Sequence, residues 1–326
     1  MNADIVQCED VYFVMVERFK NLVELMEVCS SEEKCRLYLE QVRWNGSPVC
    51  PHCGSQHKKH YQLKVKGVFK GLRKCKDCRE RFTVTVGTMF EGSHISLKKW
   101  FIGMYIFSAH KKGISSHQLA RDLGIGQKAA WFMLGRIRHC FDVKPHGKIT
   151  GEVQADECFV GGKNKNRHAN KKVKESQDRS VKDKTPVFGL LDHGYVNTQV
   201  VPNTKGKTLK PIIEAMVEKG AILITDEWGA YNGLKKDYHH EVIKHKANQY
   251  VNENGFSTNA LEGFWSLLKR GIDGIYHHVS PKHLNEYCDE FAFRYNTRNA
   301  TDADRFDLSL FIARDHITYK ELTKKI

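Results

Sequence analysis

Apolar residues in the second half of the chain follow the two periods that distinguish strands from helices. Residues 221–225 form an unbroken apolar run, which predicts a strand buried on both faces and closed by Asp226. Residues 153–155 alternate, which predicts a half-buried strand that leads into Asp156 and Glu157. Helical spacing then predicts a helix with a buried stripe of Leu261, Phe264, Trp265, Leu268 and Ile272. Both predicted strands therefore end in carboxylates.

A helical region precedes these strands. Residues 96–112 carry bulky apolar side chains at helical spacing, and residues 115–121 and 127–138 predict two more helices joined by a turn at 123–125. This is the spacing of a helix-turn-helix unit, whose later helix enters the major groove of DNA. The alternative is a plain helical linker with a solvated basic face.

In a helix-turn-helix unit, particular side chains would contact DNA. Gln127 and Lys128 open the later helix and would face the bases, whereas Arg136 and Arg138 would meet phosphates. A further, covering helix is predicted over residues 281–298 and would turn Arg294 and Arg298 toward DNA. These are the side chains that the sequence predicts to contact DNA.

Four cysteines are set apart by their spacing. They form two Cys-x-x-Cys knuckles with twenty-one residues between them, namely Cys50, Cys53, Cys75 and Cys78. Two matched knuckles are typical of a tetrahedral structural Zn²⁺ site, and residues 61–73 between them predict the strands of a zinc ribbon. A redox pair is the alternative, but it does not require a second knuckle.

Length and charge favour a partner that carries negative charge. The chain has 326 residues, a formal net charge of +14, and no apolar run long enough to cross a membrane. No signal peptide is expected at its start, so we expect a cytoplasmic protein, associated with the nucleoid in a bacterium. Nucleic acid is the partner that a basic chain of this kind favours, although basic surfaces also bind anionic membranes. Residues 161–184 predict a lysine-rich loop that either holds DNA phosphates or is a solvated insertion.

Three carboxylates are candidates for a shared metal site: Asp156, Asp226 and Glu262. If they converge at about 4 Å, each pair of charges repels by roughly 4 kcal/mol at an effective dielectric near 20, and a divalent cation removes that penalty. Hard oxygen ligands suit Mg²⁺ or Mn²⁺. Two such ions can promote the in-line displacement of a phosphodiester. Lys269 lies two helical turns beyond Glu262, on the same side of the predicted helix.

Structural roles could account for two of these acids instead. Asp226 could cap a following helix. Glu262 could complete a capping box by reaching back to the amide of Asn259. Only one of Asp156 and Glu157 can join the cluster, because neighbouring residues of a strand point to opposite faces.

Several short motifs together resemble the IS1595-family (ISXO2-like) insertion-sequence transposases. They occur in the family's order over about residues 25–300 and comprise Arg43-Trp44 with the first knuckle, residues 86–90, residues 155–157 with 161–163, residues 225–227 with Tyr231, and residues 259–270. The resemblance implies an α/β, RNase H-like catalytic domain with a mixed sheet flanked by helices, and an acidic triad that contains Asp156 and Asp226. Some members are described by an Asn and a following Lys at the third position, so both Asn259 and Glu262 are candidates. We favour Glu262, because a carboxylate binds a divalent cation better than an amide does.

The resemblance also implies a division of the chain. We expect residues 1–42 to form an N-terminal helical segment, 43–92 the zinc ribbon, 93–146 the helix-turn-helix-like module, 147–300 the catalytic domain, and 301–326 a C-terminal tail. Within the catalytic domain, the predicted order of strand, strand, strand, helix, strand is RNase H-like.

The function that follows is DNA transposition. The upstream modules would bind the terminal inverted repeats of a mobile element, and the triad would cleave double-stranded DNA and join it to target DNA, in a homo-oligomer that pairs two ends. An RNase H-like structure-specific nuclease is one alternative, and a catalytically dead zinc-ribbon DNA-binding regulator is another. Acids at all three positions argue against the regulator.

Overall fold

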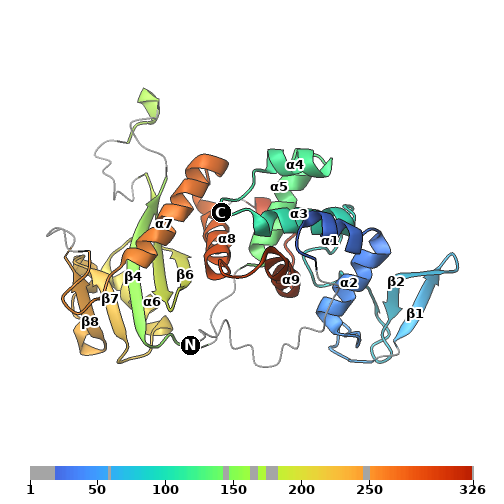
Figure 1. Cartoon of the computed structure of the whole chain (residues 1–326), viewed down its shortest axis with the longest axis horizontal. Coiled ribbons are helices and arrows are strands. Elements are labelled where there is room, and N and C mark those ends of the chain that lie inside the picture. The colour runs from blue at the N-terminus through green and yellow to red at the C-terminus, as the bar shows by residue number, and fades with distance from the viewer. Residues whose placement is uncertain are drawn as a thin grey trace.

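A computed structural model describes residues 19–57, 60–141, 147–161, 168–173, 183–244 and 250–324. A five-stranded sheet with its covering helices forms one end of the molecule, a β-hairpin projects at the other end, and a group of helices lies between them (Figure 1). Across the part of the chain so described, no helix is both long and apolar enough to span a membrane. The predicted basic loop falls largely on residues 162–167 and 174–182, which lie outside the described residues.

The sheet contains the two strands that the apolar pattern predicted to end in acids. Its strands are β4 (Glu152–Val160), β5 (Thr185–Asp192), β6 (Tyr195–Val200), β7 (Ile222–Asp226) and β8 (His239–Ile243). They lie in the order β6-β5-β4-β7-β8, in which β4, β5 and β6 are antiparallel and β4, β7 and β8 are parallel. Helix α6 (Gly206–Met216) precedes β7, so the predicted order of strand, strand, strand, helix, strand is confirmed.

Two separate apolar cores cover the two faces of this sheet. Odd-numbered residues of β4, Val153 and Ala155, pack with Leu209 and Ile213 of α6. On the other face, even-numbered residues of β4 such as Cys158 pack with α7 (Asn259–Gly271) and α8 (Leu284–Asn296). The period of two along a strand thus assigns each residue of β4 to one layer of helices.

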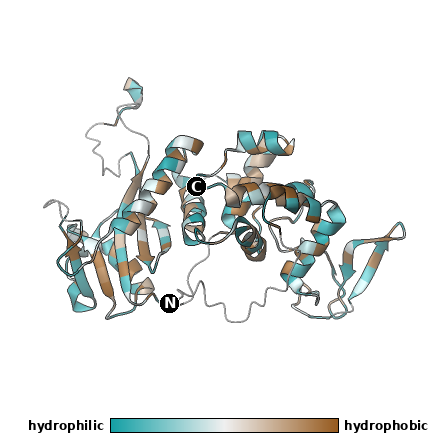
Figure 2. Ribbon diagram, in the orientation of Figure 1, coloured by the Kyte–Doolittle hydropathy of each residue, from teal (hydrophilic) through white to brown (hydrophobic). Residues whose placement is uncertain are grey.

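The first half of the chain and its last residues share a third core. The elements that contribute to it are α1 (Leu22–Val28), α2 (Glu32–Trp44), β3 (Arg81–Phe82), α3 (Leu97–Ala109), α4 (Ser116–Leu123), α5 (Gln127–His139) and α9 (Asp302–Ile312). The other elements in these parts of the chain are β1 (Tyr61–Val65), β2 (Val68–Lys74) and α10 (Tyr319–Thr323). Figure 2 shows apolar residues gathered in the helices at the middle of the molecule and along the strands of the large sheet. The ribbon, the helical module and the end of the chain are therefore packed as one body.

The expectation of a C-terminal tail is wrong. Phe306 of α9 is fully buried, with its ring 5.4 Å from that of Phe101 and 5.5 Å from that of Phe19. Leu322 of α10 is buried against α5, where a side chain on Gly135 would collide with it. The α9 and α10 helices complete the core of the N-terminal half, which a sequence pattern over two short helices does not indicate.

The predicted phosphate contacts of the helical module are also wrong. Arg136 is buried and donates to the backbone carbonyls of Met89, Glu91 and Ile317. Arg138 is buried as well, and it pairs with Glu290 of α8. The α4 and α5 helices occupy their predicted positions, with Gly124 in the left-handed conformation between them, but most of α5 is a core helix. Gln127 and Lys128 remain exposed at its start.

A buried ion network joins the helical body to the helices that cover the five-stranded sheet. Glu290 is fully buried, its carboxylate accepts hydrogen bonds from Arg138 and Tyr276, and it forms an ion pair with Arg294, whose Nη1 lies 2.6 Å from its Oε1. Arg294 also donates to the carbonyls of Phe107 and His110 in the helical body, so the prediction that it faces DNA is wrong. Burial alone would raise the pKa of Glu290, but the charges of Arg138 and Arg294 hold it below the ordinary value.

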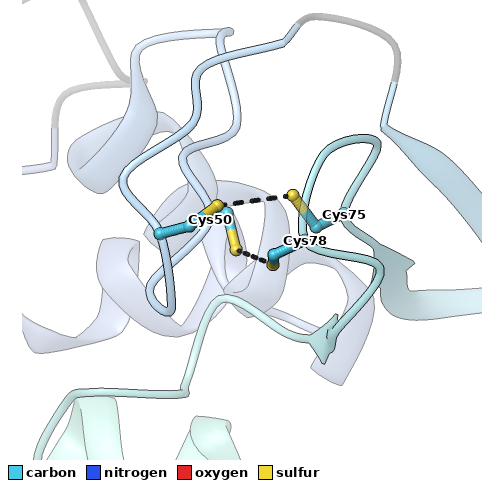
Figure 3. Close-up of side chains that lie close together, drawn as sticks. Cys50, Cys75 and Cys78 are labelled. Carbon is cyan, nitrogen blue, oxygen red and sulfur yellow. Dashed lines mark hydrogen bonds between the residues drawn. The ribbon is translucent and has the colours of Figure 1, made fainter.

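The four cysteines of the two knuckles lie together at the base of the projecting hairpin. Their sulfur atoms all lie within 4.8 Å of one another, and Cys50–Cys78 and Cys53–Cys75 are each separated by 3.7 Å between sulfurs. Figure 3 shows the labelled side chains of this cluster turned toward one another. A tetrahedral site with Zn–S bonds of about 2.3 Å requires sulfurs about 3.8 Å apart. The cluster therefore fits a structural Zn²⁺, with all four ligands from cysteine.

Metal analysis and substitution of one cysteine ligand test this site. We expect reduced, full-length protein to contain one Zn²⁺ per chain. Cys75→Ser should lose the metal and unfold the ribbon, because binding and folding of such a site are coupled. Cys140→Ala, which removes a buried thiol outside the cluster, is the matched control and should keep the metal. Metal analysis that finds no zinc in the wild-type protein would refute the assignment.

The buried network makes a prediction about stability. Glu290→Gln leaves two buried guanidinium groups without a counter-charge, so the free energy of unfolding should fall by about 3–5 kcal/mol. Because the pKa of Glu290 is lowered in the folded state, its contribution is present above the unfolded pKa and is lost as the pH falls through the folded one. Asp237→Asn, which breaks an exposed pair with Lys219, is the control and should leave the urea midpoint nearly unchanged. Equal midpoints for the two variants would contradict the role of the network.

Candidate active site

The parallel pairing of β4 and β7 brings two acids to the same edge of the sheet. Val153 pairs with Leu223 and Gln154 with Ile224, so the same register carries Asp156, in the middle of β4, to the level of Asp226, the last residue of β7. Residues two apart on a strand share a face, which places both acids on the face covered by α7. The apolar run that fills β7 thus delivers Asp226, with 8% of its surface exposed, next to Asp156.

Neighbouring acids on β4 face different layers, as the strand pattern predicted. Asp156 accepts a hydrogen bond of 3.0 Å from the indole Nε1 of Trp265 on α7. Glu157 points to the α6 side and accepts a hydrogen bond of 2.8 Å from the hydroxyl of Tyr231, a buried residue in the short helix after β7. Asp156 is therefore the member of the pair that can join a cluster under α7.

Helix α7 lies close against the sheet at this point. A Cβ on Gly189, which pairs with Asp156 across β4 and β5, would come within 2.6 Å of the Trp265 ring. The backbone N–H of Leu261 donates to the side chain of Gln154 at 3.1 Å, which holds the first turn of α7 on β4. The sequence pattern assigned Trp265 only to the apolar stripe. It gave no sign of the indole's bond to Asp156 or of the glycine that makes room for the ring.

The start of α7 separates the roles of Glu262 and Asn259. The helix begins at Asn259, with Thr258 as its cap, so the capping box that would join Glu262 to the Asn259 amide is not formed. Glu262 instead accepts a hydrogen bond from the Thr258 hydroxyl at 3.4 Å, and Asn259 is exposed in the first turn. Glu262 therefore does not form a capping box with Asn259. The residue that caps the helix is Thr258, one position earlier, and Glu262 contacts its hydroxyl.

The pKa of Asp156 depends on the charges of the other two acids. The pKa of Asp156 is raised to about 6, chiefly by burial and also by the negative charges of Asp226 and Glu262, against the opposing effect of hydrogen bonds from the Glu157 amide and Trp265. Burial and two neighbouring carboxylates thus both disfavour the ionised form of Asp156.

Asp226 also shapes the turn that follows its strand. Its Oδ1 accepts a hydrogen bond of 2.9 Å from the backbone N–H of Trp228. The next helical element is a short 3-10 helix, Gly229–Tyr231, with Trp228 rather than Asp226 at its cap position. The helix-cap explanation of Asp226 is therefore replaced by a turn that orients the carboxylate.

Lys269 lies further along the same face of β4. Its ammonium group lies beside the thiol of Cys158, two residues after Asp156, although burial still raises the pKa of that thiol to about 11. Lys269 and Glu262 are both on the exposed side of α7, as predicted from their spacing.

The donor set of the acids fits a hard divalent cation, but the carboxylates are not closed around one. Among the described residues, the cysteine cluster is the only group of His, Cys, Asp or Glu side chains whose ligand atoms all lie within 4.8 Å of one another. Asp156, Asp226 and Glu262 would have to turn toward each other to share an ion. Carboxylate oxygens that carry negative charge close together are the donors that Mg²⁺ and Mn²⁺ prefer.

Family models match both the part of the chain that holds the cysteine cluster and the part that holds the three acids. Residues 30–81 match the family described as "Transposase zinc-ribbon domain", and residues 148–296 match "ISXO2-like transposase domain" of the IS1595 group. The second match spans β4, β7 and α7 and therefore includes all three acids. The first includes all four cysteines.

Two curated proteins whose names refer to transposition are similar to this chain. An "Uncharacterized protein in transposable element ISH50" of Halobacterium salinarum is 27% identical over 278 residues, which cover 81% of this chain and 90% of that protein. An "Uncharacterized transposase-like protein" of Haemophilus influenzae is 31% identical over 102 residues, or 31% of this chain and 80% of that protein. The crystal structure of a pre-cleavage Mos1 transpososome aligns with 14% identity over 63% of this chain and 75% of that chain, with a TM-score of 0.21. On the sequence matches, the chain belongs to the IS1595 family of ISXO2-like transposases.

Proposed function

We propose that this protein is a DNA transposase that binds the ends of its element and catalyses metal-dependent strand cleavage and strand transfer through an RNase H-like domain. The observation that supports the proposal is that β4 and β7 carry Asp156 and Asp226 on one face of the sheet, near enough to Glu262 that the charges of Asp226 and Glu262 add to burial in raising the pKa of Asp156. Family membership supports the reaction class, and the three acids support the chemistry within it.

The three carboxylates would hold the ions, and the surrounding groups orient them. The Trp265 indole fixes Asp156, the Trp228 amide fixes Asp226, and the Thr258 hydroxyl contacts Glu262. When bound, Mg²⁺ or Mn²⁺ supplies the positive charge that activates an attacking oxygen and stabilises the leaving oxygen of a phosphodiester. No side chain of the protein is then needed as a covalent nucleophile, and water or a DNA 3′-hydroxyl attacks.

Glu262 is the better third ligand of the two candidates. It lies in the first turn of α7 and is close enough to raise the pKa of Asp156. Asn259 precedes it by three residues, is exposed, and offers only an amide oxygen. Lys269 would neutralise phosphate charge beside the site, because it lies on the Asp156 face of the sheet.

DNA binding is the proposed role of the rest of the chain. The β1–β2 hairpin carries Lys64, Lys66 and Lys70 exposed and has no acidic residue, so it presents positive charge beside the zinc-binding cluster. Lysines of the loop at residues 161–184 would add sequence-independent phosphate contacts. The partner is double-stranded DNA, first the terminal inverted repeats and then the target, and a homo-oligomer would pair the two ends.

A nuclease and an inactive regulator remain the competing functions. A structure-specific nuclease would cleave DNA but join no strands, whereas a regulator would bind the ends and do neither. Incubation of the purified protein with Mg²⁺, duplexes from the inverted repeats flanking its gene and a target plasmid separates all three. The proposal requires end cleavage together with covalent joining to the plasmid.

The acids make a sharper prediction. Asp156→Asn, Asp226→Asn and Glu262→Gln each remove a charge but keep the shape of the side chain, so each should abolish cleavage and joining in Mg²⁺. End binding should change less than about threefold, because the proposed DNA-binding modules lie upstream. Gel-shift and strand-transfer assays on the same preparations measure both effects.

Asn259→Ala is the matched control for Glu262→Gln. Asn259 is exposed in the same turn of α7 and makes no cap, so its loss should cost at most about 0.5 kcal/mol of stability and leave strand transfer intact. A silent Glu262→Gln beside an inactive Asn259→Ala would show that the amide, not the carboxylate, is the third functional group.

A further inference from the structure

Two residues after Asp226 the chain carries Trp228, for which the proposed chemistry gives no role. Trp228 is 45% exposed, whereas Trp44, Trp100 and Trp265 are buried. Leaving a large aromatic ring in water forfeits the gain from burying it, so an exposed tryptophan beside a functional carboxylate indicates a surface meant to be covered.

We propose that Trp228 forms a nucleobase-binding site, on which a base adjacent to the reacting phosphate stacks after leaving the duplex. The inference rests on the proposed function, and it assigns Trp228 a positioning role rather than a chemical one. The ligand class is an unpaired base of either strand at the element end.

Trp228 is held directly against the candidate active site. Its backbone N–H donates to Asp226 Oδ1 at 2.9 Å, so the ring belongs to the same turn as the carboxylate. Its indole Nε1 donates to the carbonyl of Thr204 at 3.0 Å. Both polar groups that the residue can donate are therefore satisfied within the protein, and what it offers outward is the apolar surface of the ring.

The platform is also rigid. Thr204 lies just before α6, and a Cβ on Gly206 at the start of that helix would come within 2.9 Å of the carbonyl of Ala230. The turn that carries Trp228 and the start of α6 are thus packed without space between them. A ring fixed in advance loses little conformational freedom when a base stacks on it.

Charge around the ring fits a nucleic acid strand. Residues 202–210, which include the carbonyl that holds the indole, carry Lys205, Lys207 and Lys210 and no carboxylate. Lys205 and Lys207 are exposed. An aromatic face beside lysines is the usual combination for holding single-stranded nucleic acid, because every base has a face that stacks and every nucleotide a phosphate.

The location of Asp226 supplies the reason for an unpaired base. Asp226 is 8% exposed, so a phosphate that reaches it must approach the sheet edge closely. The nucleotide beside that phosphate then meets the exposed ring of Trp228, which is only two residues away. Enzymes that act on buried parts of a duplex extrude a nucleotide for this purpose, and a stacking partner offsets part of the cost of unpairing.

The experiment combines a protein change with a DNA change. Trp228→Ala removes the ring but keeps the backbone N–H that orients Asp226, and Trp228→Phe keeps a ring. On fully paired duplexes of the inverted repeat, Trp228→Ala should cleave at least about 10-fold more slowly than wild type in Mg²⁺. Trp228→Phe should lie within about threefold of wild type. The assay uses full-length, zinc-loaded protein.

Duplexes with one abasic position, moved in turn through the nucleotides around the cleavage site, identify the stacked base. At the correct position, wild type and Trp228→Ala should cleave within about twofold of each other, because the partner of the ring is gone. An undiminished deficit at every position would mean that the ring has only a structural role, and would overturn the proposal. So would full activity of Trp228→Ala on paired DNA, or a change in its oligomeric state that accounts for the loss. Failure of the wild type to cleave any duplex would instead refute the proposed function.

Discussion

The parallel pairing of β4 with β7 is the constraint on which the candidate site depends. It sets Asp156 and Asp226 at the same level of adjacent strands, on one face of the sheet. Helix α7 adds Glu262 to that face because Gln154, Gly189 and Trp265 hold it there. A slip of one residue in β4 would turn Asp156 away from α7 and bring Glu157 in its place, so the register specifies which acid functions.

Two hydrogen-bond donors partly offset the negative charge around Asp156. Two carboxylates at about 4 Å repel by roughly 4 kcal/mol at an effective dielectric near 20, which is a large share of a domain's net stability. Hydrogen bonds from Trp265 and the Glu157 amide stabilise the ionised form of Asp156, yet its pKa is still raised. The hydrogen bonds within the protein therefore do not fully offset the effects of burial and of the neighbouring negative charges on Asp156.

Sequence patterns predicted the parts of the fold whose signals are local. The apolar run of β7, the stripe of α7 and the spacing of the cysteine knuckles each depend on residues close together in the chain, and the structure places all of them as expected. Asp226 ends β7 and Glu262 lies in the first turn of α7, but Asp156 lies in the middle of β4, which continues to Val160 beyond the strand that the alternation predicted.

Contacts between distant segments were not predictable in the same way. Arg136, Arg138 and Arg294 look like DNA-binding residues in a basic chain, but partners more than 40 residues away bury them. The α9 helix was missed because its packing surface only exists once α2 and α3 have come together. The cap of α7 was misplaced by one residue, which is the usual uncertainty of a helix boundary.

The central claim is that Asp156, Asp226 and Glu262 form one cation site. Titration of the zinc-loaded protein with Mn²⁺, followed by electron paramagnetic resonance of the free ion, tests this without DNA or turnover. The account predicts Mn²⁺ binding by the wild type and by Asn259→Ala, and a loss of at least about 10-fold in affinity for Asp226→Asn and for Glu262→Gln. Equal Mn²⁺ affinity in all four proteins would contradict it.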